Sequence, residues 1–475
     1  ADRNHYYMFQ QEEQMIPQEN LYASVCKKVV TLPHVRDAKD FWYTSRICNE
    51  ALLELRHGEN GPVHINFIVE NDYPIPGGIV KFDENNLPDV KKIDRLTLED
   101  SKEKWLRKAD LLKRSKILIV YGQKGPLSRE EEKAIEDFSN AYNCVFSIDL
   151  LSNLHTSKAI PTFVLSRLLN SKEIQELVPD IVITMNANTI SEIKGRLTPY
   201  KNQFSHWHVS AKGEVSDVFK CLPDVVECSP KTFFEKFAEL AKGEEFSKDY
   251  FNQWSEYYRQ IGNKGSLNQE PIPYSSMYAT QQLISQMLPN SLFHIANSNS
   301  IRLANYFTID PSITVFGNRG THGIDGSMSS FIGQAHVSQK LSFLLIGDLS
   351  FFYDMNALWN RYIGKNIRIM ICNNSGGAIF HSFPNTTNVP TLDIHIAAAH
   401  ETSVKAWVQS RGFKYLSATN KEELTEKMPD FLESNSNVPI VFEVFTDMEI
   451  DAKCIDRLTK KYRKASSMKE KVANT

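Results

Sequence analysis

The stretch that decides the fold is a pair of apolar segments that each end in polar residues. It runs from LSFLLIGDLS at residues 341–350 to IRIMICNNSGG at residues 367–377. Each apolar segment has the length of a buried strand, and a helix-like stretch lies between them. This pattern predicts two parallel strands joined by a crossover helix, whose carboxyl ends lie at one edge of a sheet. Asp348 and Asn374 are therefore expected at the same edge.

Asp348 and Asn374 suit a hard cation. Mg²⁺ takes few protein oxygens, demands octahedral geometry and fills its remaining positions with water and phosphate oxygens. The first turn of a helix after Asp348 would present N–H groups to such phosphates. The segment thus predicts a site for magnesium and a diphosphate. The alternative is purely structural, with Asp348 as a helix cap and Asn373-Asn374 as an Asx turn.

Size and composition exclude several classes of protein. The 475 residues are enough for about three domains. A net charge of −3 argues against a nucleic-acid partner, and no apolar run approaches the ~18 residues that a membrane span needs. We see no secretory signal at the start. The seven cysteines are scattered without a CxxC pattern, so we expect reduced thiols in a cytoplasmic protein.

Apolar strands alternate with helical stretches along the chain, which predicts an α/β fold with mostly parallel sheets flanked by helices. The opening lacks the first elements of such a domain, so we expect the first of three domains to be incomplete. The expected division is 1–70 for this first part, 71–97 for a linker, 98–245 for a central α/β domain, 246–274 for a connecting helix and linker, and 275–475 for the last domain with a helical tail.

The motifs around the strand ends resemble a known family. Gly347-Asp348-Leu349 followed by Asn373-Asn374 is similar to the thiamine-diphosphate signature, although glycine is usual where this chain has Leu349. Three further motifs narrow the resemblance to the 2-succinyl-5-enolpyruvyl-6-hydroxy-3-cyclohexene-1-carboxylate (SEPHCHC) synthases of menaquinone biosynthesis: NSNSIR at residues 297–302, GNRG at 317–320 and GIDG at 323–326. The resemblance implies that residues 1–70 end a pyrimidine-binding domain and residues 275–475 form a diphosphate-binding domain.

The resemblance also implies an activity. Enzymes of this family are transferases that decarboxylate 2-oxoglutarate and add the resulting four-carbon carbanion to isochorismate. They use thiamine diphosphate with Mg²⁺ or Mn²⁺, and their site lies between two subunits. We therefore expect small dicarboxylate substrates, a homodimer or homotetramer, and neither nucleic acid nor membrane as a partner.

Several residues match the cofactor positions of the family. Asp348, Asn374 and the carbonyl of Gly376 would bind the metal ion. Ile324 would hold the cofactor in its bent form, although a buried aliphatic residue at a helix start explains it equally well. The remaining cofactor positions are Gly347, Leu349, Ser350, Ile379 and Phe380, of which the last two are as well explained by core packing.

Substrate positions are also matched. They are Arg3, Gln14, Ser298, Arg302 and Arg319. Guanidinium groups bind carboxylates bidentately, which suits two dicarboxylate substrates. The alternative for any single arginine is a surface ion pair. The family's basic pair from the middle domain has no counterpart in residues 190–196, so that role is not carried over.

Two rival interpretations remain open. An acetolactate-synthase-like enzyme or another 2-oxo-acid decarboxylase would share the metal site but lack the pair Arg302 and Arg319. A catalytically incomplete or non-enzymatic chain would keep only the fold. The family needs a glutamate against the pyrimidine ring, and neither Glu12 nor Glu13 matches it. We therefore assign no catalytic residue and expect this chain alone not to turn over.

Overall fold

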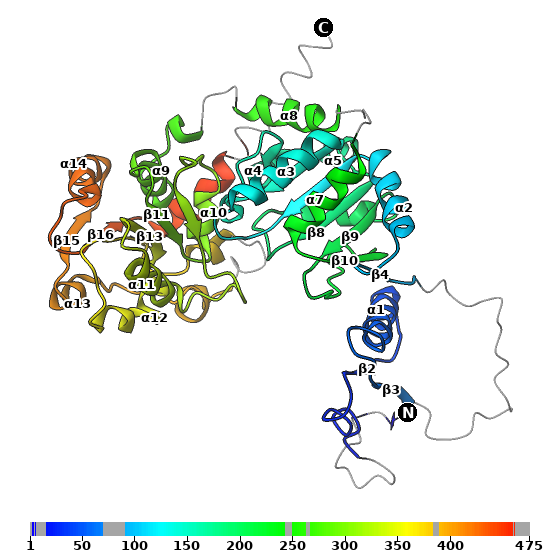
Figure 1. Ribbon diagram of the computed structural model, residues 1–475. Coiled ribbons are helices and arrows are strands. Elements are labelled where there is room, and N and C mark those ends of the chain that lie inside the picture. Colours follow the sequence, from blue (N-terminus) through cyan, green and yellow to red (C-terminus); the bar gives the residue numbers. More distant parts are fainter. Residues whose placement is uncertain are drawn as a thin grey trace.

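The computed structural model describes residues 2–3, 5, 16–69, 91–242, 249–262, 267–382, 389–458 and 460. Within them the strands form three sheets in which every pairing is parallel, with helices on their faces (Figure 1). The predicted α/β fold is confirmed. Gln14 lies outside the described residues, and of Arg3 only the backbone is described. No helix in these ranges is long and apolar enough to cross a membrane.

The first block is a three-stranded sheet in the order β1-β3-β2 with one covering helix. Its helix starts where the Asp37 side chain accepts the backbone N–H groups of residues 39 and 40, both at 2.8 Å. Its buried core is small and consists of Val30, Ile47 and Ala51. The elements are β1 (Asp2–Arg3), β2 (Lys28–Leu32), α1 (Ala38–Glu54) and β3 (Val63–Val69).

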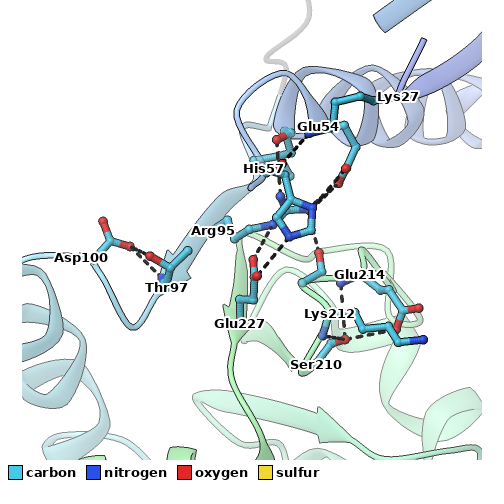
Figure 2. Close-up of polar contacts among 12 residues, drawn as sticks. Lys27, Glu54, His57, Arg95, Thr97, Asp100, Ser210, Lys212, Glu214 and Glu227 are labelled. Atoms are coloured by element: carbon cyan, nitrogen blue, oxygen red, sulfur yellow. Dashed lines mark hydrogen bonds and ion pairs between the residues drawn. The ribbon is translucent and has the colours of Figure 1, made fainter. Parts of the chain in front are cut away.

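A cluster of charged side chains joins the first block to the middle one (Figure 2). The His57 ring lies between two carboxylates, with Nδ1 3.1 Å from Glu54 and Nε2 3.0 Å from Glu227. Arg95 Nη2 lies 3.0 Å from the Glu54 carboxylate. Since Glu227 and Arg95 belong to the middle block, these contacts tie the end of α1 to its sheet.

The middle block is a seven-stranded sheet in the order β4-β10-β9-β8-β5-β6-β7. Its strands are β4 (Asp94–Thr97), β5 (Ile117–Tyr121), β6 (Cys144–Ile148), β7 (Ala159–Pro161), β8 (Ile181–Met185), β9 (Ser205–Val209) and β10 (Asp224–Glu227). Its helices are α2 (Lys102–Lys113), α3 (Arg129–Ala141), α4 (Thr162–Leu168), α5 (Ser171–Glu176), α6 (Ile193–Leu197), α7 (Pro230–Leu240) and α8 (Asp249–Gly262).

Two elements of the middle block differ from the expected division. Residues 94–97 were expected in a linker but form β4 at the edge of the sheet, because four residues of mixed polarity show no strand periodicity. The expected connecting helix is α8, which lies across the middle block in Figure 1. Its Tyr250 and Trp254 are fully buried in that block's core.

The third block is a six-stranded sheet in the order β12-β11-β13-β14-β16-β15. Its strands are β11 (Leu292–Ile295), β12 (Thr314–Phe316), β13 (Ser342–Gly347), β14 (Ile367–Asn373), β15 (Lys414–Ala418) and β16 (Ile440–Phe445). Its helices are α9 (Ser276–Gln286), α10 (Asn299–Ala304), α11 (Ser327–Ser338), α12 (Asp348–Tyr353), α13 (Lys405–Ser410) and α14 (Lys421–Leu432).

The strand order of the third sheet reverses between β11 and β13, since the chain leaves β11 toward β12 and leaves β13 toward β14. Such a reversal opens a crevice at the carboxyl ends of the strands, where ligands of α/β proteins bind. The middle block packs beside this sheet: Gln123 Nε2 donates to the carbonyl of Gly317 at 2.7 Å, and Asn153 exchanges two hydrogen bonds with Val315, both at 2.8 Å.

Candidate active site

Asp348 and Asn374 follow neighbouring strands of the third sheet. Gly347, the last residue of β13, pairs with Cys372 of β14. Asp348 is 2% exposed and Asn374 is 8% exposed. The backbone N–H of Gly376 donates to Asp348 Oδ2 at 2.9 Å. The structure therefore brings Asp348 and Gly376 into contact and leaves Asn374 at the adjoining strand end.

The side-chain amide of Asn374 is held in one orientation. Its Nδ2 donates to Asp451 Oδ2 at 2.8 Å, while in the part of the chain that the structure describes no group hydrogen-bonds to its buried Oδ1. Asp451 is fixed in turn by the Ser276 N–H at 2.7 Å and the Thr446 hydroxyl at 2.8 Å. Burial raises the pKa of Asp451. A buried acceptor without a donor is unusual in proteins and suits a cation.

Asp348 has a second neighbour that sequence patterns did not indicate. His400 Nε2 lies 3.2 Å from Asp348 Oδ2. The N–H of Thr402 donates to His400 Nδ1 at 3.1 Å, which holds the ring at this position. Neither His400 nor Asp451 belongs to a motif, and each reaches the site only through packing of a distant segment.

The turn after Asn374 requires glycine. Gly376 has a φ of 146°, and a Cβ there would lie 2.7 Å from the carbonyl oxygen of Ala397. Gly377 N–H donates to the same carbonyl at 2.7 Å. This close approach fixes the backbone whose carbonyl is the third predicted metal ligand. Among the described residues no three His, Cys, Asp or Glu side chains gather as a metal site, so any cation here relies on a mixed set of carboxylate, amide and carbonyl oxygens.

The predicted cofactor residues surround this edge. The Ser350 hydroxyl donates to the carbonyl of Ile324, which ties the start of α12 to the loop before α11. This bond directs the hydroxyl proton of Ser350 at Ile324 and not at a ligand. The aliphatic and aromatic members are half-buried, namely Ile324, Leu349, Ile379 and Phe380.

The predicted substrate residues lie on the other side of the reversal point, with Ser298 and Arg302 after β11 and Arg319 after β12. Arg302 Nη1 donates to the carbonyl of Ser298 at 2.8 Å, and Ser298 has a φ of 64°, a strained left-handed conformation. Arg319 Nη1 donates to Asn297 Oδ1 at 2.6 Å. Burial and the nearby charge of Arg302 lower the pKa of Arg319. The structure thus brings Ser298, Arg302 and Arg319 together.

A third arginine, which the sequence did not indicate, comes from the middle block. Arg167 of α4 forms an ion pair of 2.5 Å with Glu192. Burial and, next, the charge of Arg167 lower the pKa of Arg302, while Glu192 acts on it in the opposite direction. The middle block therefore contributes a basic residue to this edge, although residues 190–196 lack the family's basic pair.

Comparison with known proteins identifies the family. No family model matches the chain. A protein of Bacteroides fragilis named 2-succinyl-5-enolpyruvyl-6-hydroxy-3-cyclohexene-1-carboxylate synthase is 36% identical over 466 residues, which are 96% of this chain and 80% of that protein. A protein of the same name from Phocaeicola vulgatus is 36% identical over 461 residues, which are 95% of this chain and 79% of that protein. One from Flavobacterium johnsoniae is 29% identical over 442 residues, which are 91% of this chain and 76% of that protein. This chain belongs to the SEPHCHC synthase family.

Proposed function

We propose that this protein is a thiamine-diphosphate-dependent transferase that forms SEPHCHC from 2-oxoglutarate and isochorismate in menaquinone biosynthesis. Family membership supports the reaction. One structural observation carries the cofactor assignment. Asn374, next to the strand end of Asp348 at the carboxyl edge of a parallel sheet, has a buried oxygen with no hydrogen-bond partner among the residues that the structure describes. Carboxylate and amide oxygens suit a hard cation such as Mg²⁺, and protein-bound Mg²⁺ also takes phosphate oxygens of a ligand.

The donor set fits Mg²⁺ or Mn²⁺. Asp348 would supply a carboxylate oxygen, Asn374 its Oδ1 and Gly376 its carbonyl oxygen, and diphosphate oxygens and water would complete the coordination. Bound thiamine diphosphate supplies the nucleophilic carbon and the electron sink on which a 2-oxo acid loses CO₂. Ile324 and Leu349, with Ile379 and Phe380, would cover the cofactor with apolar surface and exclude water.

The charged side chains after β11 would bind and orient the substrates. Arg302 and Arg319 offer planar donor pairs that match carboxylates, and Ser298 adds a hydroxyl. Arg3 and Gln14 are proposed as further substrate residues on the strength of the family motif alone. Buried guanidinium groups favour dicarboxylates over neutral or monoanionic acids because each unpaired charge in such a place costs free energy.

The remaining proposals concern organisation. We propose a homodimer or homotetramer with the site between subunits, a cytoplasmic location, and a division into 1–70, a linker, a central domain to 245, a connecting segment and a diphosphate-binding domain from 275. The pairing of β4 with β10 supports an earlier start of the central domain than residue 98.

The cofactor assignment is tested by calorimetric titration with thiamine diphosphate in the presence and absence of Mg²⁺. We expect binding that depends on the metal ion. No binding in either condition would favour an incomplete or non-enzymatic chain. The reaction is tested by incubation with isochorismate and either 2-oxoglutarate or pyruvate, with products identified by mass spectrometry. Turnover of pyruvate in preference to 2-oxoglutarate would favour another 2-oxo-acid decarboxylase.

A further inference from the structure

Arg167 lies near the predicted substrate arginines because α4 of the middle block contacts Tyr306, which follows α10. The rings of Phe163 in α4 and Tyr306 after α10 are 5.5 Å apart and nearly perpendicular. The Arg167 guanidinium lies 5.1 Å from the Phe163 ring centre and also interacts with the Tyr306 side chain. Tyr306 lies four residues after Arg302, and the charge of Arg167 acts on Arg302, so both arginines contribute to the junction between α4 and the segment after β11.

Positive charge exceeds negative charge at this junction. Arg302 and Arg319 influence each other electrostatically, as do Arg167 and Arg302. Arg319 is 6% exposed, and none of the groups that the structure describes pairs with its buried Nε. Donors that remain unpaired in a buried place favour an incoming acceptor, and guanidinium donors favour a carboxylate.

Two carboxylates are near, and they differ in how firmly they are held. Asp149 is 3% exposed, and its oxygens accept the N–H groups of Leu151 at 2.9 Å and Ile190 at 2.6 Å. Glu192 has a side chain that is 46% exposed and forms an ion pair with Arg167. Asp149 is therefore a fixed part of the fold, whereas Glu192 can rotate into solvent at little cost.

We propose that Arg167 binds one carboxylate of the dicarboxylate substrate together with Arg302, and that Glu192 occupies this position until the substrate displaces it. The inference rests on the proposed function. One carboxylate of a dicarboxylate can bind Arg302 and Arg319 while the other displaces Glu192 from Arg167. A monocarboxylate can bind the Arg302–Arg319 pair or displace Glu192, but it cannot do both. The internal carboxylate thus makes the site selective for dicarboxylates.

The test is calorimetric binding of glutarate, a dicarboxylate that lacks the reactive keto group, to the protein with thiamine diphosphate and Mg²⁺. Butyrate is the monocarboxylate comparison. We expect Arg167→Gln to raise the Kd for glutarate about tenfold and Arg167→Lys to restore part of the loss, since lysine keeps the charge but not the fork. Glu192→Gln should lower the Kd for glutarate by about threefold to tenfold. It should also reduce the ratio between the Kd for butyrate and the Kd for glutarate.

Matched controls are Arg107→Gln on α2 and Glu426→Gln on α14, both exposed and remote from the junction, which should leave the Kd unchanged. Arg302→Gln separates this inference from the proposed function. If glutarate binding depends on Arg302 but not on Arg167 or Glu192, the inference is wrong and the function stands. If binding depends on none of the three, the substrate assignment fails as well. Should Arg167→Gln not fold, as judged by its thermal transition, an unchanged Kd in Glu192→Gln overturns the proposal by itself.

Discussion

The carboxyl edges of the middle and third sheets share a topology but differ in what they leave unpaired. The strand order reverses between β8 and β5 in one sheet and between β11 and β13 in the other. In the middle sheet the backbones of the two strand ends approach closely: Gly122 N–H donates to the carbonyl of Met185 at 3.1 Å, and a Cβ on Gly122 would lie only 1.6 Å from the Ala187 oxygen. In the third sheet the buried side-chain oxygen of Asn374 has no donor within the described ranges.

Two asparagines show the difference most clearly. Asn153 at the middle edge donates to the carbonyls of Lys124 and Val315, both at 2.8 Å, and accepts the N–H of Val315 at 2.8 Å. The side chain of Asn374 has one hydrogen-bond partner in the described part of the chain, namely Asp451. Polar groups that satisfy one another stabilise the fold, whereas those left unsatisfied can bind a ligand. A shared sheet topology therefore does not by itself make a binding site.

The largest expected effect is at Asp348, the carboxylate at the carboxyl edge of the third sheet. Asp348→Ala should raise the Kd for thiamine diphosphate with Mg²⁺ about a thousandfold, equivalent to about 4 kcal/mol, because the change removes the charged member of the proposed ligand set. Calorimetry measures the change, and Asp393→Ala, which removes a carboxylate with a 63% exposed side chain, is the control. An affinity near that of the unchanged protein would show that the metal ion does not bind at the carboxyl edge of the third sheet.

The middle sheet should respond to pH through groups that serve stability. The hydroxyl of Thr184 lies 2.9 Å from His206 Nε2 and 2.8 Å from His208 Nδ1, and burial lowers the pKa of His208 to about 4. A histidine with a lowered pKa stabilises the fold fully above its ordinary value of 6.5 and loses this contribution as the pH falls.

We therefore expect His208 to account for about 3 kcal/mol of unfolding free energy lost between pH 6.5 and pH 4. Urea unfolding at several pH values measures it. His208→Gln keeps a polar partner for Thr184 and should flatten the pH dependence; His206, whose pKa burial also lowers, will leave a residual slope. An unchanged slope in the variant would show that His208 is not buried in its neutral form.

The asparagine pair tests the comparison directly. Asn374→Ala should weaken metal-dependent cofactor binding about a hundredfold and change stability little, because it removes a ligand that has one protein partner. Asn153→Ala should lower the free energy of unfolding by about 2 kcal/mol without changing cofactor affinity, because three backbone groups lose their partners. Calorimetry and urea unfolding of both variants measure this. If both variants lost cofactor affinity and stability to the same extent, the carboxyl edges of the middle and third sheets would not differ in function.

The smallest expected effect concerns a residue that acts through another. Asp451→Asn should raise the Kd for Mg²⁺ and cofactor about tenfold, since the amide of Asn374 would no longer be held with its oxygen toward the site. Asp447→Asn, close in sequence and at the exposed end of the same segment, is the control. Binding enthalpies measured for both would show whether Asp451 orients Asn374. A loss of stability without a change in affinity would limit Asp451 to a structural role.

Much of the third sheet was predictable because its central strands β13, β14 and β16 are buried along nearly their whole length and are mostly apolar. The strand expected at 367–372 is β14, with one added residue, and the polar residues that follow it lie at the sheet edge. The strand β4 was not predictable, since DRLT at residues 94–97 has neither alternation nor an apolar run. Arg167 and His400 were equally hidden, because no local pattern links them to residues that they meet only in space.

The amino-acid sequence on its own determined the α/β class and the polar residues that end β13 and β14, because burying apolar strands sets where the chain must turn polar. Only the tertiary structure decided which of those polar groups are satisfied. Among the described residues, the Asn374 oxygen has no hydrogen-bond partner, while Asp451 holds its amide nitrogen. Arg302 has a third arginine near it because Phe163 of α4 contacts Tyr306, which follows α10. Hydrogen-bond partners of this kind come from segments far apart in the chain, and packing alone brings them together.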